Sequence, residues 1–217
     1  MARTTSAFVI ALLGAESTGK TTLAAELQAA LAAPGRSVGR VAEYLREFCE
    51  LHGRTPRRDE QRGIALEQTR RIAEAAAQHD IVIADTTALM IAVYSDYVFD
   101  DTGLYADALA AQARCDLTLL TALDLPWAAD GWIRDGAHAR EPVDTKVRAA
   151  LDAARVPYAI VAGQGLARRD AALACIGRAL APPPATDADA ASSSRWQWHC
   201  ERCGDIACER HALRLPR

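Results

Sequence analysis

Apolar residues along the chain follow two patterns, which predict two kinds of element. Short apolar segments bounded by glycine or polar residues indicate strands, and the uninterrupted run 81–84 is typical of a strand buried in a parallel sheet. Strands are expected at 7–13, 37–41, 81–84, 117–120 and 158–161. Apolar residues three or four positions apart indicate helices. Such spacing occurs at 23–31, 43–51, 57–79, 87–96, 103–113, 143–154 and 166–180.

The alternation of strands with helices implies a parallel sheet covered by helices on both faces. The predicted fold is a three-layer α/β domain with five parallel strands. Ligands of such sheets bind at the carboxyl ends of the strands. The residues that follow each predicted strand are therefore the first candidates for a functional site.

The sequence divides into three regions: a main domain over 1–181, a flexible linker over 182–195 and a tail over 196–217. The linker begins with three prolines and continues with Ala, Asp and Ser, a composition that favours flexibility. Inside the main domain, residues 125–142 mix Trp, Arg, Gly and Pro without a clear period. This pattern fits a lid better than a core element.

The composition of the chain argues against binding to nucleic acid or insertion into a membrane. The chain has 217 residues, of which 50% are hydrophobic, and a net charge of −3, so we expect a globular protein without an electrostatic affinity for nucleic acid. No stretch approaches the ~20 apolar residues that span a membrane. Cys49, Cys115 and Cys175 are scattered and resemble small buried hydrophobes, which points to the reducing cytoplasm.

The strongest motif follows the first predicted strand. It has the form G-x-x-x-x-G-K-[ST], the phosphate-binding loop of P-loop NTPases, and the expected strand and helix flank it. Lys20 would contact the β- and γ-phosphates of ATP, and the Thr21 hydroxyl would bind Mg²⁺. The predicted ATP-binding residues are Gly14, Ala15, Glu16, Ser17, Thr18, Gly19, Lys20, Thr21 and Thr22. With this motif, the expected fold is a P-loop NTPase domain with the strand order of nucleoside monophosphate kinases.

Two acids follow later strands. Asp85 comes directly after the run 81–84, where it would hold Mg²⁺ through water or accept a proton from a substrate hydroxyl. The alternative is that it caps a helix beginning at Thr86. Glu43 and Arg46 are three residues apart and would face the same side of a helix. They would anchor a sugar hydroxyl and a phosphate, or form an exposed ion pair.

The predicted lid offers two arginines and a tryptophan. Arg134 and Arg140 would close over the transferring phosphoryl group and help to exclude water, although arginines are also common on surfaces. Trp127 would stack on an aromatic ring of the substrate, or pack on the stem of the lid.

The tail carries Cys200-x2-Cys203-x4-Cys208-x2-His211, four residues of the kinds that bind zinc. The two pairs are closer together than in common zinc fingers. The expected ligands of a Zn²⁺ ion are Cys200, Cys203, Cys208 and His211, and the ion would supply most of the folding energy of the tail. An unstructured tail with incidental thiols is the alternative. The tail could also bind a protein partner.

Several of these motifs together resemble one family. The loop with Glu16, the element Glu43-Tyr44-x-Arg46-Glu47-Phe48, the strand that ends at Asp85-Thr86, and Trp127-x-x-Asp130-Gly131-x-x-Arg134 are similar to the NadR-type ribosylnicotinamide kinase domain. They occur in the same order over about 8–180. The resemblance implies transfer of a phosphoryl group from ATP to the 5′-hydroxyl of nicotinamide riboside, which gives nicotinamide mononucleotide.

On this resemblance, Glu43, Tyr44 and Arg46 line the nucleoside and phosphate site, Trp127 contacts the nicotinamide ring, and Arg134 is a lid arginine. Asp85 is the acid linked to the metal, or the base, and the sequence leaves the base open between Glu43 and Asp85. The bifunctional members of the family carry further domains before the kinase. Only thirteen residues precede Gly14 here, so we expect neither adenylyl transfer nor repressor activity.

The sequence is also compatible with two other functions. One is a kinase for another nucleoside or a small hydroxylated metabolite. The other is a switch protein whose slow ATPase controls the zinc tail. A switch needs no pocket for a second substrate, so the Glu43 and Arg46 pair argues against it.

Overall fold

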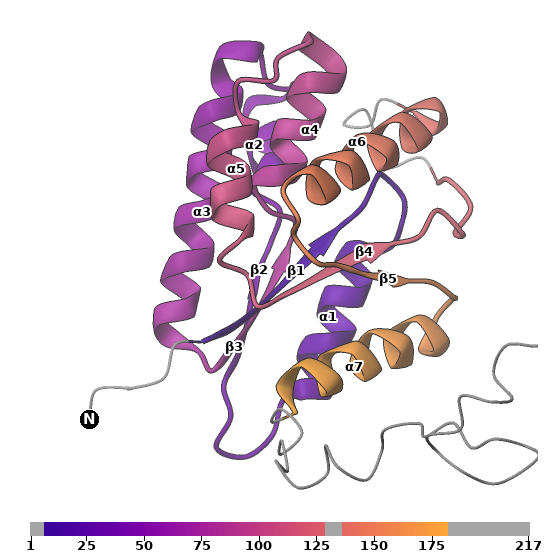
Figure 1. Ribbon diagram of the computed structural model, residues 1–217. Coiled ribbons are helices and arrows are strands. Elements are labelled where there is room, and N and C mark those ends of the chain that lie inside the picture. Colours follow the sequence, from indigo (N-terminus) through magenta and orange to yellow (C-terminus); the bar gives the residue numbers. More distant parts are fainter. Residues whose placement is uncertain (1–6, 129–135, 182–217) are drawn as a thin grey trace, which may run out of the picture. The chain divides into compact units, whose positions relative to one another are not determined.

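The computed structural model describes residues 7–128 and 136–181 (Figure 1). Its centre is a sheet of five strands in the order β2-β3-β1-β4-β5, and all four strand pairs are parallel. The predicted α/β sheet is confirmed. The strands are β1 (Phe8–Leu13), β2 (Val38–Val41), β3 (Ile81–Asp85), β4 (Leu117–Thr121) and β5 (Ala159–Val161).

Helices cover both faces of this sheet, with α1 and α7 on one face and α3, α4 and α6 on the other (Figure 1). The helices are α1 (Lys20–Leu31), α2 (Tyr44–His52), α3 (Gln61–Gln78), α4 (Ala88–Phe99), α5 (Tyr105–Gln112), α6 (Arg140–Ala153) and α7 (Leu166–Leu180). Two short 3₁₀ helices, η1 (Arg58–Glu60) and η2 (Ala137–Ala139), precede α3 and α6.

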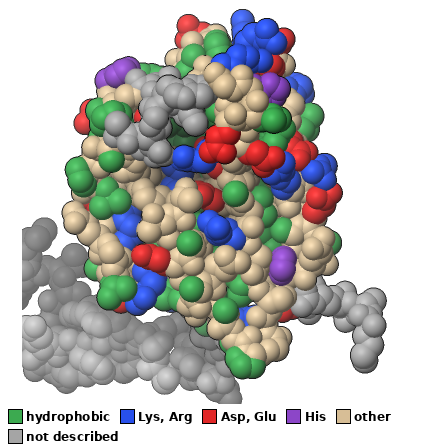
Figure 2. Space-filling model, turned by 180° about the vertical axis from the view of Figure 1, so that it is seen from behind, with side chains coloured by type: hydrophobic (Ala, Val, Ile, Leu, Met, Phe, Trp, Pro, Cys, Tyr) green, Lys and Arg blue, Asp and Glu red, His purple; other side chains and the backbone are tan. Residues whose placement is uncertain are grey.

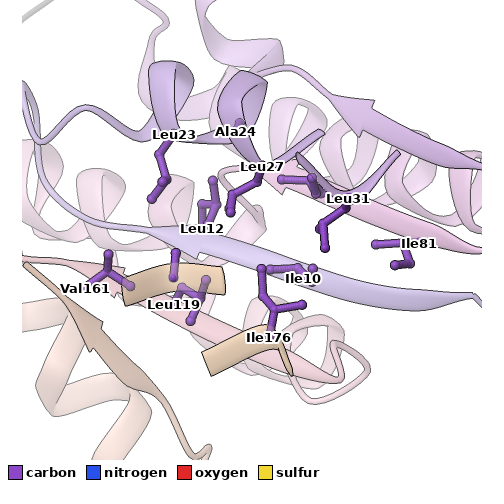
Figure 3. Close-up of a cluster of buried hydrophobic side chains, with 12 residues drawn as sticks. Ile10, Leu12, Leu23, Ala24, Leu27, Leu31, Ile81, Leu119, Val161 and Ile176 are labelled. Atoms are coloured by element: carbon purple, nitrogen blue, oxygen red, sulfur yellow. The ribbon is translucent and has the colours of Figure 1, made fainter. Parts of the chain in front are cut away.

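Alternate residues of β1 face opposite layers. Ile10 and Leu12 pack against α1 and α7 in the cluster drawn in Figure 3. Val9 packs on the α3 side of the sheet, and Leu13 packs with α4 and α6. Because successive strand residues point to opposite faces, a strand covered on both sides must be apolar throughout. The unbroken apolar run of β1 is the sequence signature of this double burial.

The segment predicted as a lid, 125–142, is shorter than expected. Helix α6 already begins at Arg140, three residues before the stripe that starts at Val143. Pro142 is compatible with this start because the first helical turn needs no partner for its N–H groups. Residues 129–135 of the predicted lid lie outside the described residues.

The chain divides into two units, 1–180 and 181–217. The linker and the candidate zinc ligands Cys200, Cys203, Cys208 and His211 lie outside the described residues, so the zinc site stays a prediction. Within 7–128 and 136–181, none of the helices has the length and apolar character needed to cross a lipid bilayer. In the same ranges the cysteines are free thiols, buried at Cys49 and half-buried at Cys115 and Cys175.

Candidate functional site

The predicted phosphate-binding loop connects β1 to α1, and its backbone requires glycine at its first position. Gly14 has a φ of 146°, and a Cβ atom there would lie 2.1 Å from Thr121 Oγ1 of the neighbouring strand β4. Gly19 has a φ of 75° and is the N-cap of α1. These two glycines let the loop turn tightly at the carboxyl end of β1 and lead into a helix N-terminus, an arrangement that favours anions.

The lysine of the loop is held by hydrogen bonds to the loop itself. Lys20 Nζ donates to the main-chain oxygens of Gly14 and Ala15, both at 2.8 Å. These bonds hold the ammonium group over the loop. Thr21 and Thr22 lie in the first turn of α1 and line a cavity next to the loop.

A buried arginine supports the loop from behind. Arg168 of α7 is 4% exposed and donates from Nη1 to the Thr18 oxygen at 3.0 Å and from Nε to the Gly163 oxygen at 2.8 Å. Its Nη2 pairs with Asp124 Oδ1, and Asp124 Oδ2 accepts the Gly163 N–H at 2.6 Å. A single guanidinium therefore joins the phosphate-binding loop, the end of β4 and the loop after β5. The sequence analysis missed it, because its partners are mostly main-chain atoms far along the chain.

A cavity of about 430 Å³ extends from this loop to α2, α3 and α4. One part of its wall is the loop 14–22 except Ala15, which is buried. Another part carries Glu43 and Arg46, which the sequence placed in the site. The rest of the lining is Leu45, Cys49, Thr55, Pro56, Gln61, Thr86, Met90, Tyr94, Val98 and Phe99. Figure 2 shows one face of the molecule, where basic and acidic side chains are interleaved rather than gathered in a basic patch.

Buried Gln68 of α3 connects the ends of two strands beside the cavity. Its Oε1 accepts the Tyr44 N–H at 2.7 Å, and its Nε2 donates to the oxygens of Ala42 and Thr86, both at 3.3 Å. The residue between Ala42 and Tyr44 is Glu43. Thr86 has a φ of 80°, a conformation that favours glycine, so its backbone needs this support. Gln68 thus positions both the Glu43 turn and the turn after Asp85.

Asp85 is the last residue of β3 and pairs in register with Leu12 of β1, just before the phosphate-binding loop. It is 1% exposed, and its Oδ1 has no hydrogen-bond partner within the described residues. It does not cap α4, because Thr87 is the N-cap of that helix and accepts the Leu89 N–H. A buried carboxylate oxygen without a partner fits a water ligand of Mg²⁺ or a substrate hydroxyl. The Thr86 hydroxyl beside it is also buried without a partner among the described residues.

The pKa of the Cys49 thiol is affected by two charged residues of the cavity wall. Burial raises the pKa of Cys49, the negative charge of Glu43 raises it further, and the positive charge of Arg46 lowers it. Both charged groups therefore act on the same wall, and Cys49 stays protonated at neutral pH. The cavity therefore combines the carboxylate of Glu43 and the guanidinium of Arg46 with the phosphate-binding loop.

Four predicted substrate contacts do not line the cavity, and Asp85, buried at the end of β3, is one of them. Tyr44 is not part of the cavity lining, and Arg71 stacks on its ring with Cζ 4.3 Å from the ring centroid. Arg140 is also absent from the lining. Its buried guanidinium donates to the oxygens of Leu123 and Leu125, so it fixes the segment after β4. Trp127 is 36% exposed and does not line the cavity, and Arg134 lies outside the described residues.

The family of AAA domains matches residues 9–169, which include the phosphate-binding loop, Glu43, Asp85 and Arg168. This chain belongs to that family. Among curated proteins, none matches this AAA domain. Solved structures with the same fold include NadR in complex with NR, with a TM-score of 0.67 and 20% identity, and NadR in complex with NAD and AMP-PNP, with a TM-score of 0.64 and 21% identity.

The matches to these solved structures cover different shares of the matched proteins. Both NadR comparisons cover 79% of this chain but only 49% of NadR, so the chain spans about half the length of those proteins. Thymidylate kinase from Ehrlichia chaffeensis has a TM-score of 0.56 and 14% identity, and the match covers 80% of this chain and 99% of that kinase. The shared property is the P-loop kinase fold.

Proposed function

We propose that this protein is a Mg-ATP-dependent kinase that phosphorylates the 5′-hydroxyl of nicotinamide riboside to give nicotinamide mononucleotide. The observation that carries this proposal is the shared cavity. A phosphate-binding loop forms one part of its wall, and Glu43, Arg46 and apolar side chains of α2 and α4 form another. A protein that only hydrolysed ATP would not need this second part.

The loop would bind the phosphates of ATP. Its main-chain N–H groups and the N-terminus of α1 favour negative charge. The ammonium group of Lys20 is held at the loop by the main-chain oxygens of Gly14 and Ala15. The Thr21 hydroxyl and Asp85 would hold Mg²⁺, which fits the buried Oδ1 of Asp85. The ion neutralises charge on the phosphates when it is bound.

The acceptor would lie between the loop and α2. In the transfer step, the 5′-oxygen of the riboside bonds to the γ-phosphorus, the bond from that phosphorus to the β–γ bridging oxygen breaks, and ADP leaves. We assign Glu43 as the base that takes the hydroxyl proton, because Glu43 lines the cavity and Asp85 does not. Arg46 would stabilise negative charge on the acceptor side. Most of the rate would come from positioning and charge neutralisation.

Nicotinamide riboside is the acceptor favoured by two further observations. The motifs Glu43-Tyr44-x-Arg46-Glu47-Phe48 and Asp85-Thr86 are similar to those of NadR-type kinase domains, and both occur at strand ends beside the cavity. NadR itself, which has been solved with NR, shares the fold at 20% identity. A kinase for another nucleoside is the second candidate, because Met90, Tyr94 and Phe99 would accept any flat aromatic ring.

The test is ADP release from Mg-ATP by the purified protein, with nicotinamide riboside, with other nucleosides and without an acceptor. Strong stimulation by nicotinamide riboside alone, with the mononucleotide detected by mass, is the expected result. Stimulation only by another nucleoside would replace the named substrate. Hydrolysis that no acceptor changes, together with loss of a protein partner on deletion of 195–217, would favour the switch protein instead.

A further inference from the structure

One buried side chain in the cavity wall carries an acceptor atom without a partner. Gln61 is 5% exposed, and its Oε1 makes no hydrogen bond within the described residues. A buried amide oxygen without a partner costs about 1–3 kcal/mol, so such groups normally contact a protein atom, a water molecule or a ligand. Gln61 lines the same cavity as Glu43 and the phosphate-binding loop. A bound molecule would therefore satisfy it.

The backbone that carries Gln61 is anchored by its neighbours. It is the first residue of α3 and follows η1, and its own N–H donates to the Arg58 oxygen. The preceding residue, Glu60, is held by Arg54 with distances of 2.6 and 2.7 Å. The backbone at this point is thus anchored, and the amide is presented beside the apolar side chains of the wall.

We propose that the Gln61 amide recognises a carboxamide on the aromatic ring of the acceptor. A primary amide presents one acceptor oxygen and one N–H donor group, and a second primary amide can pair with both through two parallel hydrogen bonds. Apolar side chains in the wall would contact the ring, and Gln61 would form hydrogen bonds with the carboxamide on the ring. This inference rests on the proposed function and names the group that selects the substrate.

The same geometry discriminates against a carboxylate on the ring. A carboxylate only accepts hydrogen bonds, so it could use the Nε2 of Gln61 but would leave Oε1 unpaired beside a negative charge. A ring without a substituent would leave the Oε1 of Gln61 without a hydrogen-bond donor. Sites built to bond a polar group reject analogues that lack it more strongly than apolar pockets reject a change of size.

The experiment compares kcat/KM for three pyridinium ribosides: one with a carboxamide, one with a carboxylate and one without a substituent. The proteins are the wild type, Gln61→Met, which keeps the side-chain length, and Gln61→Glu, which removes the N–H donor. Gln78→Met is the matched control, because Gln78 is the last residue of the same helix and does not line the cavity. The KM for ATP and the unfolding temperature of each variant are measured in parallel.

The wild type should prefer the carboxamide by at least about 10-fold, and Gln61→Met should lower kcat/KM for it about 10- to 100-fold. The same variant should change kcat/KM for the unsubstituted riboside by less than about 3-fold, and Gln61→Glu should discriminate most strongly against the carboxylate. Equal loss for all three ribosides, or no preference in the wild type, would overturn the assignment of Gln61 alone. Failure of the wild type to phosphorylate any of them would overturn the proposed function as well.

Discussion

Gln68 Nε2 lies 3.3 Å from the main-chain oxygen of Thr86, so a side chain of α3 holds the strained residue that follows Asp85. The other end of the same amide accepts the N–H that follows Glu43. A buried side chain that lies outside the cavity therefore determines the spacing between the two acids of the site.

Replacing Gln68 by methionine should destabilise the protein and weaken catalysis together. The change removes the partners of the Tyr44 N–H and of the Ala42 and Thr86 oxygens, and an unsatisfied buried group of this kind costs about 1–3 kcal/mol. Urea unfolding measures the stability and steady-state kinetics the activity. Gln78→Met is the control, and a Gln68→Met protein as stable as that control would contradict the role of this amide.

Replacing Arg168 by methionine should weaken nucleotide binding. Its guanidinium holds the Thr18 oxygen of the loop and pairs with Asp124, so its loss frees the loop to adopt other conformations. We expect about a 10-fold rise in Kd for a non-hydrolysable ATP analogue, measured by calorimetry. Half-buried Arg169, the next residue of the helix, bonds its neighbour Asp170 and provides the control substitution. Unchanged affinity in Arg168→Met would exclude the support that we describe.

Replacing Gly14 by alanine should disrupt the loop because of one specific contact. The new Cβ would lie 2.1 Å from Thr121 Oγ1 and 3.3 Å from Thr121 Cβ. The φ of 146° remains unfavourable for alanine in any case. Gly14→Ala should therefore lose ATP binding. The double variant Gly14→Ala, Thr121→Ala should recover part of this binding. Full binding by the single variant, in the same calorimetric assay, would show that the loop tolerates a side chain there.

Acid should loosen the packing of α2 on α3. Hydrogen bonds from Arg70 and Arg71 lower the pKa of Glu67 to about 2, and Arg71 also bonds Glu47 of α2 and stacks on Tyr44. Because the folded pKa lies below the unfolded value of about 4.3, the stabilisation is present above that value and is lost as the pH falls toward 2. The urea midpoint of the wild type should fall over this range more steeply than that of Glu67→Gln. Parallel curves would exclude this contribution.

The sequence was sufficient to predict the elements because each strand and helix has a local apolar pattern. The apolar run before Asp85 and the glycines of the phosphate-binding loop can also be interpreted from neighbouring residues alone. Arg168 could not be predicted, since its contact with the Thr18 oxygen spans 150 residues and involves a main-chain atom. Arg140 was placed in the site from its charge, but its guanidinium bonds the carbonyl oxygens after β4. Charge alone does not tell a substrate contact from a structural one.

Transfer of the γ-phosphoryl group to nicotinamide riboside is tested most directly by a single turnover. Excess protein is mixed with Mg-ATP labelled in the γ-phosphate and with nicotinamide riboside, and the label is followed by mass. The label should appear in nicotinamide mononucleotide in step with ADP, and Lys20→Ala should slow this at least about 100-fold. Label found only in inorganic phosphate, or normal transfer by Lys20→Ala, would contradict the assignment of this cavity as the active site of a riboside kinase.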